Sequence, residues 1–355
     1  MSTRAAGRTS MSAGAIKRGR VRLEDIAKEI GVSRAVVGRV LLGSGDNIRV
    51  SRQKARLIRQ VAKRMRYRPN QIARQLGGKS SQLLGVLMGA AHGQSRHHRL
   101  VAVEAEARRR GYRIIIGLIA DDCTNVDSYV DTFDSYNVEA MLYLDTRFDV
   151  SQRLLQFGPV VSSVRLPGHD ICYVEMDRAE AGRLGTEHML ARGRKRVALV
   201  VEPDPWPLTR VDTEKRRGFL EALAAHGLDY GLQTIYRPSH GILWTMEETL
   251  EAVDHLVGKL GCDAIICVRD ILAVHLLKAL RRRGLRVPED VALMGFDNLD
   301  LSTAVDPELT SIDHRHEQCA KVMLDLVVRM KEDPDFAGEQ AGIEIPPLLV
   351  VRQST

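Results

Sequence analysis

Arginines and small residues stand close together in the stretch SRAVVGRVLLGSG, residues 33–45, where the outward positions would be Arg34, Ala35, Gly38 and Arg39. A guanidinium group binds phosphates and the acceptor edge of guanine, and small residues let a backbone approach a large partner closely. Valines and leucines recur between these positions at helical spacing, and the Ser33 hydroxyl can cap the helix start. The stretch therefore predicts a short helix whose apolar face packs inward and whose basic face binds an anionic partner.

A tight turn at Gly31 joins this helix to an earlier amphipathic segment, VRLEDIAKEI, and a third segment, VSRQKARLIRQVAKRMRY, follows with Ser51 as its cap. Two short helices joined by a glycine turn are typical of a helix-turn-helix. The second helix of that motif lies in the major groove of DNA, with its N-terminal residues at the base edges. We therefore expect a DNA-binding domain over residues 21–68, contacting DNA through Ser33, Arg34, Ala35, Gly38 and Arg39.

A second DNA contact is predicted in the stretch YRPNQIARQLGG that follows. Pro69 ends the third helix, and a short new segment runs to the glycine pair at 77 and 78. An exposed leucine beside basic residues can insert as an apolar wedge into the minor groove. We interpret residues 69–80 as a hinge helix and linker whose DNA contacts are Asn70, Ala73, Arg74 and Leu76.

Charge divides the chain sharply. Residues 1–80 carry 20 Lys and Arg against 4 Asp and Glu, whereas the remainder carries 32 basic and 41 acidic residues. A basic head on an acidic body indicates an anionic polymer as the partner of the head alone. Residues 1–20 are interpreted as a disordered basic arm. The five scattered cysteines, the lack of a secretory signal and the absence of a membrane-length apolar run favour a cytoplasmic, nucleoid-associated protein.

The stretch 81–355 alternates between buried strands, such as LLGVLM and VALMGF, and amphipathic helices, such as ILAVHLLKALRRRG. Strand–helix units of this length imply parallel sheets with helical crossovers. The stretch is too long for one modest sheet, so we expect an α/β body of two linked lobes. Ligands in such folds bind at the carboxyl ends of the strands, in the crevice between the lobes.

Several motifs carry a resemblance to one family: LEDIAKEIGVS, YRPNQIARQL, VPEDVALMGFDN and the final VVRQST. Through these the chain resembles the lactose-repressor (LacI/GalR) family of bacterial transcription regulators over residues 21–355. The resemblance implies a homodimer that binds double-stranded operator DNA under the control of a small-molecule effector, and acts as a repressor. It also implies a periplasmic-binding-protein-like core over 81–355, with an N-lobe of about 81–176 and 314–343 and a C-lobe of about 177–313 and 344–355.

The resemblance further implies an effector site, formed by Asp177, Lys215, Trp244, Arg269 and Asp297. The chain departs from the family at several positions. Lys215 replaces the usual arginine, Arg269 replaces an asparagine, and Gly38 replaces a serine that donates to phosphate. Two cations at one crevice suit a carboxylate or phosphate, so the effector is either a sugar or an acidic or phosphorylated metabolite.

Other readings of the sequence are weaker. The stretch DHRHEQC (313–319) contains metal-ligand types, but it follows a family motif at a lobe crossover, where polar residues are common. We interpret QSRHHR (94–99) as a polar loop after the first strand, solvated rather than in contact with an effector. No catalytic constellation, metal site or cofactor motif stands out, which disfavours an enzyme. A solute-binding receptor with the same body is the alternative function, against which the basic head and the missing secretory signal argue.

Overall fold

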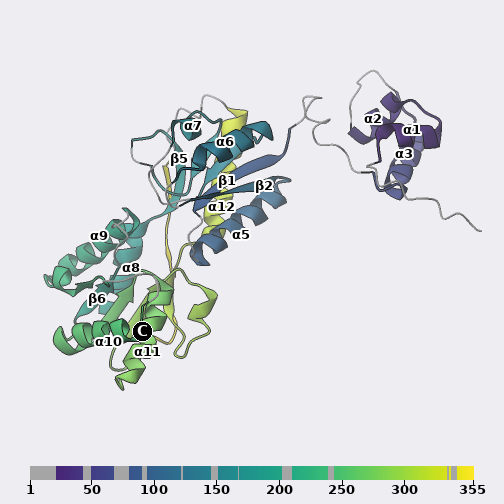
Figure 1. The fold of residues 1–355 in the computed structure, drawn as a ribbon. Helices are drawn as coiled ribbons and strands as arrows, with labels where there is room; N and C mark the ends of the chain where they lie inside the picture. The colour runs from purple at the N-terminus through teal and green to yellow at the C-terminus, as the bar shows by residue number, and fades with distance from the viewer. Residues whose placement is uncertain are drawn as a thin grey trace, which may run out of the picture. The chain divides into compact units, whose positions relative to one another are not determined.

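The computed structural model describes residues 21–42, 49–67, 80–89, 94–120, 123–144, 151–166, 168–201, 210–238, 244–333, 336 and 342–355. The chain divides into two compact units, Met1–Ser81 and Gln82–Thr355. We call the first unit the head and the second the body (Figure 1). Across the described residues, no helix combines the length and apolarity needed to cross a membrane.

The head is a three-helix unit made of α1 (Leu23–Ile30), α2 (Arg34–Leu42) and α3 (Arg52–Arg64). Ile26, Val37 and Ile58, one from each helix, are fully buried and form its core. Between α1 and α2 the backbone of Gly31 takes a left-handed conformation with φ of 72°, which an L side chain rarely adopts. The Ser51 hydroxyl accepts a hydrogen bond from the backbone N–H of Lys54 and caps α3. The predicted helix-turn-helix geometry is present in the head.

The first half of the body is built on a six-stranded sheet with the order β11-β5-β4-β3-β1-β2. Every strand pair in this sheet is parallel, as the alternating pattern predicts. We call this half the N-lobe; its strands and helices are β1 (Leu83–Gly89), α5 (Gln94–Arg109), β2 (Arg113–Ile119), α6 (Val126–Ser135), β3 (Ala140–Tyr143), α7 (Gln152–Leu155), β4 (Val160–Ser162), β5 (Cys172–Met176), α12 (His316–Glu332) and β11 (Gly342–Ile345).

The second half, the C-lobe, is built on another six-stranded sheet with the order β12-β10-β9-β8-β6-β7. Its pairs are parallel except β10 with β12. Its elements are α8 (Arg178–Ala191), β6 (Val197–Val200), α9 (Arg210–Ala225), η1 (Gly231–Thr234), β7 (Ile235–Tyr236), α10 (Met246–Val253), η2 (Asp254–Lys259), β8 (Ala264–Cys267), α11 (Asp270–Arg282), β9 (Ala292–Phe296), η3 (Asp300–Ser302), β10 (Thr310–Asp313) and β12 (Leu348–Val350).

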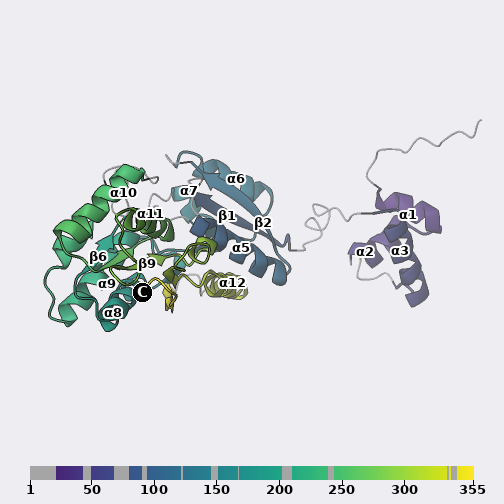
Figure 2. The same cartoon turned by 90° about the horizontal axis from the view of Figure 1, so that it is seen from below.

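Apolar side chains cover both faces of the N-lobe sheet. Leu84 and Val86 of β1 point to one face and pack in the cluster that contains Leu324 of α12. Leu87 points to the other face, in the cluster that contains Phe133 of α6. Helices α5 and α12 lie side by side in both views of the body (Figures 1 and 2). The run of buried apolar residues in β1 follows from this coverage on both faces.

The chain passes between the two lobes three times. It leaves β5 and enters α8 at Asp177, returns between β10 and α12, and passes from β11 to β12 after Ile345. Strand β11 thus ends two residues beyond the N-lobe boundary expected at 343. Three connections at one junction let the lobes change their mutual angle without breaking either sheet, so the junction is the natural place for a ligand to act.

One expectation is wrong. Residues 94–99 are the first turns of α5, not a loop. Their sequence, QSRHHR, has no apolar periodicity from which a helix could be predicted.

Candidate functional site

The N-terminal end of α2 presents the exposed surface of the helix-turn-helix. Ser33, Arg34 and Ala35 are all exposed. The Ser33 hydroxyl accepts a hydrogen bond from the backbone N–H of Val36 at 3.4 Å, so it caps the helix while facing solvent. The guanidinium Nε of Arg34 lies 3.5 Å from the Glu24 carboxylate, and both side chains are more than half exposed. Such a pair contributes little to stability, so Arg34 can exchange this contact for one with DNA.

Gly38 is buried, although it follows Arg34 by four residues and Ala35 by three and so lies on the same side of α2 as these exposed residues. A residue without a side chain does not project beyond its neighbours. The expectation that Gly38 is exposed is therefore wrong, whereas its side of the helix is as expected. Arg39, one residue later, is partly exposed.

Helix α3 adds positive charge to the head. Its exposed basic side chains are Arg52, Lys54, Arg56, Arg59, Lys63 and Arg64. One of them, Arg64, contacts Glu29 of α1 at 2.5 Å. The rest form a surface suited to phosphates. The predicted minor-groove contacts Asn70, Ala73, Arg74 and Leu76 lie outside the described residues.

Three of the predicted effector residues meet at the lobe junction: Lys215 of α9, Arg269 before α11 and Asp297 after β9. The Lys215 ammonium is buried, donates a hydrogen bond to the carbonyl of Val268 at 3.0 Å, and lies 4.6 Å from the centre of the Phe296 ring. Burial by itself raises the pKa of the Asp297 carboxyl. The contact with His314 and the charges of Lys215 and Arg269 outweigh burial and hold that pKa below its usual value.

His314 and the backbone around it complete the C-lobe side of the junction. Its Nε2 lies 3.0 Å from the Asp297 carboxylate, and burial lowers the pKa of His314 despite that neighbour. The backbone takes a positive φ at Asp297 (115°), Asn298 (49°) and Arg315 (52°). Left-handed backbone at residues other than glycine costs free energy and is concentrated at functional sites. These angles therefore favour the junction as a functional site.

Asp270 anchors the same region from inside the C-lobe. Its fully buried carboxylate accepts hydrogen bonds from the backbone N–H of Leu299 and the hydroxyls of Ser302 and Ser311, at 2.6–2.8 Å. Burial and the charge of Asp297 raise the pKa of Asp270 to about 7, although the three donors oppose this. These bonds fix the segment after β9 against the start of α11, which holds Arg269 and Asp297 in register.

The N-lobe contributes Arg99 of α5 and Ser163 after β4 to the junction. The Arg99 guanidinium donates a hydrogen bond to the Ser163 hydroxyl at 3.0 Å. Both side chains line a cavity of about 10 Å³, as do the ion-paired residues Glu175 and Arg178 and the His314 ring. Arg99 was not predicted as a site residue, since the polar run around it suggested a solvated loop.

Two predicted effector residues lie elsewhere. Asp177 caps α8, where its carboxylate accepts from the backbone N–H of Glu180 at 2.8 Å. Trp244 is buried in the C-lobe core and packs edge-on against Tyr236, with ring centres 6.3 Å apart. Within the described structure its indole N–H has no hydrogen-bond partner. Parts of the loops beyond the carboxyl ends of β1, β2, β3, β6 and β7 lie outside the described residues, at 90–93, 121–122, 145–150, 202–209 and 239–243.

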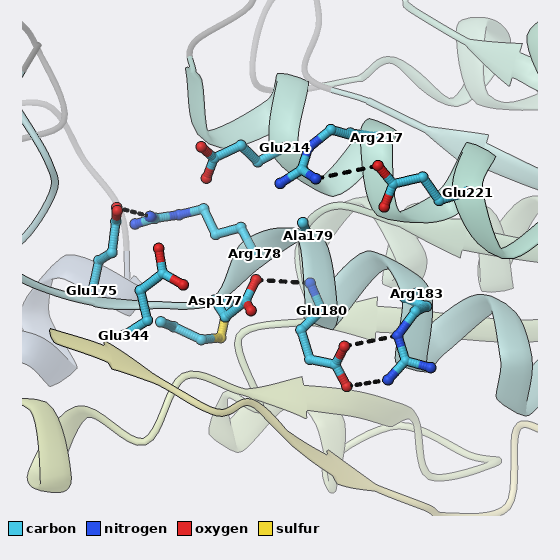
Figure 3. Close-up of a pocket in the computed structure, with 11 residues that line it drawn as sticks. Glu175, Asp177, Arg178, Ala179, Glu180, Arg183, Glu214, Arg217, Glu221 and Glu344 are labelled. Carbon is cyan, nitrogen blue, oxygen red and sulfur yellow. Dashed lines mark hydrogen bonds and ion pairs between the residues drawn. The ribbon is translucent and has the colours of Figure 1, made fainter. Parts of the chain in front are cut away.

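Asp177 belongs to a separate pocket of about 260 Å³ beside the crossover from β5 to α8 (Figure 3). Six carboxylates line it, from Glu175, Asp177, Glu180, Glu214, Glu221 and Glu344. Figure 3 shows Arg178 reaching Glu175 on one side, and Arg183 and Arg217 paired with Glu180 and Glu221 on the other. With twice as many carboxylates as arginines, this pocket repels anions.

The two histidines of DHRHEQC, His314 and His316, stack with their ring centres 5.3 Å apart. His316 Nε2 lies 3.3 Å from the Ser95 hydroxyl, and the Cys319 thiol donates to the backbone carbonyl of His314 at 3.6 Å. In the ranges that the structure describes, no group of three His, Cys, Asp or Glu side chains is placed to hold a metal ion. The polar residues of this crossover serve the lobe junction instead.

Comparison with known proteins covers nearly the whole chain. A sequence profile described as a periplasmic binding protein-like domain matches residues 186–355. The transcriptional repressor CytR of Escherichia coli strain K12 is 26% identical over 339 residues, which are 94% of this chain and 96% of that protein. The repressor PurR of Pasteurella multocida is 25% identical over 94% of this chain and 98% of that protein. Both matches extend through head and body.

Solved structures resemble the fold over the same extent. A crystal structure of the lac repressor dimer bound to operator and the anti-inducer ONPF has a TM-score of 0.77 and 20% identity, and covers 95% of this chain and 99% of that one. At this identity the likeness concerns the fold. It agrees with the three-helix head and the two-lobed α/β body expected from the sequence.

Proposed function

We propose that the chain is a member of the LacI/GalR family of DNA-binding transcriptional regulators, and that it is a repressor whose head binds operator DNA and whose body binds the controlling effector. The observation that carries this proposal is the exposed N-terminal end of α2 on a strongly basic three-helix head. On this proposal residues 21–68 are the DNA-binding domain, 69–80 the hinge and 81–355 the effector-binding core.

DNA recognition is assigned to α2. With α2 in the major groove, Arg34 and Ala35 face the base edges, and Ser33 and Arg39 lie toward the phosphates. The basic side chains of α3 supply affinity that depends on salt rather than on sequence. Leu76 of the hinge inserts at the centre of the operator. Gly38 lies on the same side of α2 as Arg34 and Ala35, where its lack of a side chain lets the helix backbone approach DNA closely.

Effector control is assigned to the junction between the lobes. A small molecule held by both lobes favours one mutual angle, and the three crossovers transmit that angle to the N-lobe, from which the hinge leads. An effector shifts operator affinity only through its different affinity for the two angles, which in regulatory proteins is worth about 1–3 kcal/mol.

Dimerisation is assigned to the N-lobe surface of α5 and β2. Strand β2 is an edge strand, and Ile116 and Leu118 on it are 41% and 48% exposed. Val101 of α5 beside it is half exposed. Exposed apolar side chains on a sheet edge suit a second copy of the chain. The solved lac repressor structure with the same fold is also a dimer. Two heads related by two-fold symmetry then bind a pseudo-palindromic operator on the nucleoid, in the cytoplasm.

Selection from random DNA duplexes with the full-length chain tests the proposal. We expect a pseudo-palindrome to be enriched. Arg34→Ala relaxes specificity at one position of each half-site and weakens binding by about 1–3 kcal/mol. The control Arg286→Ala, at an exposed side chain of the C-lobe, leaves binding unchanged. Tight binding of a small molecule without any enriched duplex would instead support the solute receptor.

A further inference from the structure

Arg99 differs from the other charged groups of the lobe junction in what it contacts. It projects from the N-lobe helix α5, and its one described hydrogen bond goes to the neutral hydroxyl of Ser163. No carboxylate of the described residues forms an ion pair with it. Burial and the positive charge of Arg178 lower the pKa of the Arg99 guanidinium to about 10. Its surroundings therefore disfavour the very charge that it carries.

The carboxylates nearest to Arg99 already have partners. Glu175 is paired with Arg178 at 2.6 Å, with both side chains buried. Asp297 contacts His314 and faces Lys215. The neighbouring histidines do not supply negative charge either. Among the described residues of this junction, cations therefore outnumber carboxylates.

The acidic pocket of Figure 3, beside the same crossover, has the opposite balance, with six carboxylates and three arginines. An anion that approaches the space between the lobes is thus drawn to the Arg99 side and repelled from the Asp177 side. The cavity at Arg99 and the acidic pocket at Asp177 adjoin each other but differ in the sign of their charge.

We propose that the effector is an organic anion, and that Arg99 and Ser163 bind its carboxylate or phosphate group, with Lys215 and Arg269 closing toward it from the C-lobe. The inference rests on the proposed function, since it specifies the ligand of the effector site. A guanidinium offers two parallel donors to a planar carboxylate or a phosphate, and a hydroxyl beside it donates a third hydrogen bond. Because the binding groups come from both lobes, the anion favours the closed junction.

The first experiment measures thermal unfolding of the full-length chain while inorganic phosphate replaces chloride at constant ionic strength. Phosphate raises the melting temperature saturably in the unaltered chain, and Arg99→Gln weakens the apparent affinity at least tenfold. Arg286→Gln, which removes the same charge from an exposed position of the C-lobe, behaves as the unaltered chain. Phosphate also binds the basic head, but that contribution is equal in all three proteins and cancels in the comparison.

Two further readouts keep the inference open to refutation. If Arg99→Gln unfolds the N-lobe, the melting temperature of this variant without phosphate falls. We expect this melting temperature to be unchanged or raised, because the substitution removes a cation from surroundings that disfavour its charge. Arg99→Lys keeps the charge but loses the paired donors, and we expect intermediate affinity. Equal phosphate affinity in the unaltered chain and in Arg99→Gln, or no saturable effect in either, would overturn the inference.

A second experiment names the class of anion and tests the proposed function separately. Glucose, gluconate and glucose 6-phosphate are titrated into the full-length chain bound to its selected operator, and operator affinity and ligand affinity are both measured. Binding of gluconate but not glucose assigns a carboxylate; binding of glucose 6-phosphate alone assigns a phosphate. A chain that binds its operator and responds only to glucose, with or without Arg99, retains the proposed function and loses this inference. A chain that selects no operator loses the proposed function, while the phosphate titration still decides the role of Arg99.

Discussion

Helices α8 and α9 meet backbone to backbone at Gly218, and replacing this glycine by alanine tests how the C-lobe holds its side of the junction. A methyl group at Gly218 would lie 1.8 Å from the carbonyl oxygen of Ala179 and 2.9 Å from the backbone nitrogen of Arg183. These are backbone atoms, so no side chain can rotate away. To reach an ordinary contact of about 3.4 Å the two helices must separate by about 1.5 Å.

The separation sets the size of the effect. Overpacking a core costs about 1–3 kcal/mol, and the upper part of the range applies here because a whole helix must move. Alanine regains about 1 kcal/mol of helix propensity relative to glycine. We therefore expect Gly218→Ala to lower the free energy of unfolding of the C-lobe by about 2 kcal/mol. Since α9 also carries Lys215, the same shift displaces that ammonium from the Val268 carbonyl.

Urea denaturation followed by tryptophan fluorescence measures this effect, because Trp244 is buried in the C-lobe core. Gly258→Ala is the matched control. Gly258 lies in the helical segment η2 of the same lobe, and a methyl group there meets nothing within 4 Å. That variant should be neutral or stabilised by up to about 1 kcal/mol. If Gly218→Ala unfolds within about 0.5 kcal/mol of the unaltered chain, the close approach of α8 and α9 does not determine C-lobe stability.

Three other predictions concern buried charge and helix capping. Burial raises the pKa of Asp270 from 3.8 to about 7, so ionisation of this carboxyl destabilises the folded state as the pH rises. The free energy of unfolding of the unaltered chain, compared with that of Asp270→Asn, should fall by about 1 kcal/mol between about pH 6 and pH 8. A difference that does not change with pH in urea denaturation would contradict this. Glu175→Ala leaves the buried Arg178 without its partner and should cost about 3–5 kcal/mol, measured by calorimetry, whereas a loss below about 1 kcal/mol would show that the pair is not needed. Ser51→Ala removes the cap of α3 and should lower head stability by about 1 kcal/mol, seen as faster hydrogen exchange in α3 alone; unchanged exchange there would refute the capping role.

The sequence predicted the helices and strands of this protein better than it predicted the side-chain contacts at the lobe junction. The helices of the head and the buried strands β1 and β9 follow from local periodicity, which is visible within ten residues. The Asp270 network was not predictable in this way, since its partners lie 29, 32 and 41 residues away and are ordinary serines and a backbone N–H.

Two positions were not predicted correctly. Arg99 lies in a polar run without apolar spacing, so neither its helix nor its position at the junction could be read from neighbours in sequence. That position is decided by packing against elements distant in sequence, which a local pattern does not encode. Gly38 lies on the expected side of α2 but is buried, because a glycine has no side chain that extends beyond its neighbours.

The last stretch of the body, residues 342–355, has a consequence for how the protein is made. It supplies β11 to one sheet and β12 to the other, and the Ser354 hydroxyl then donates to the Leu293 carbonyl and accepts from the backbone N–H of Thr310. On the ribosome, therefore, neither lobe can complete its sheet until this stretch has emerged, whereas all three helices of the head are available after residue 64. A nascent chain thus carries a complete head on an incomplete body for most of its synthesis.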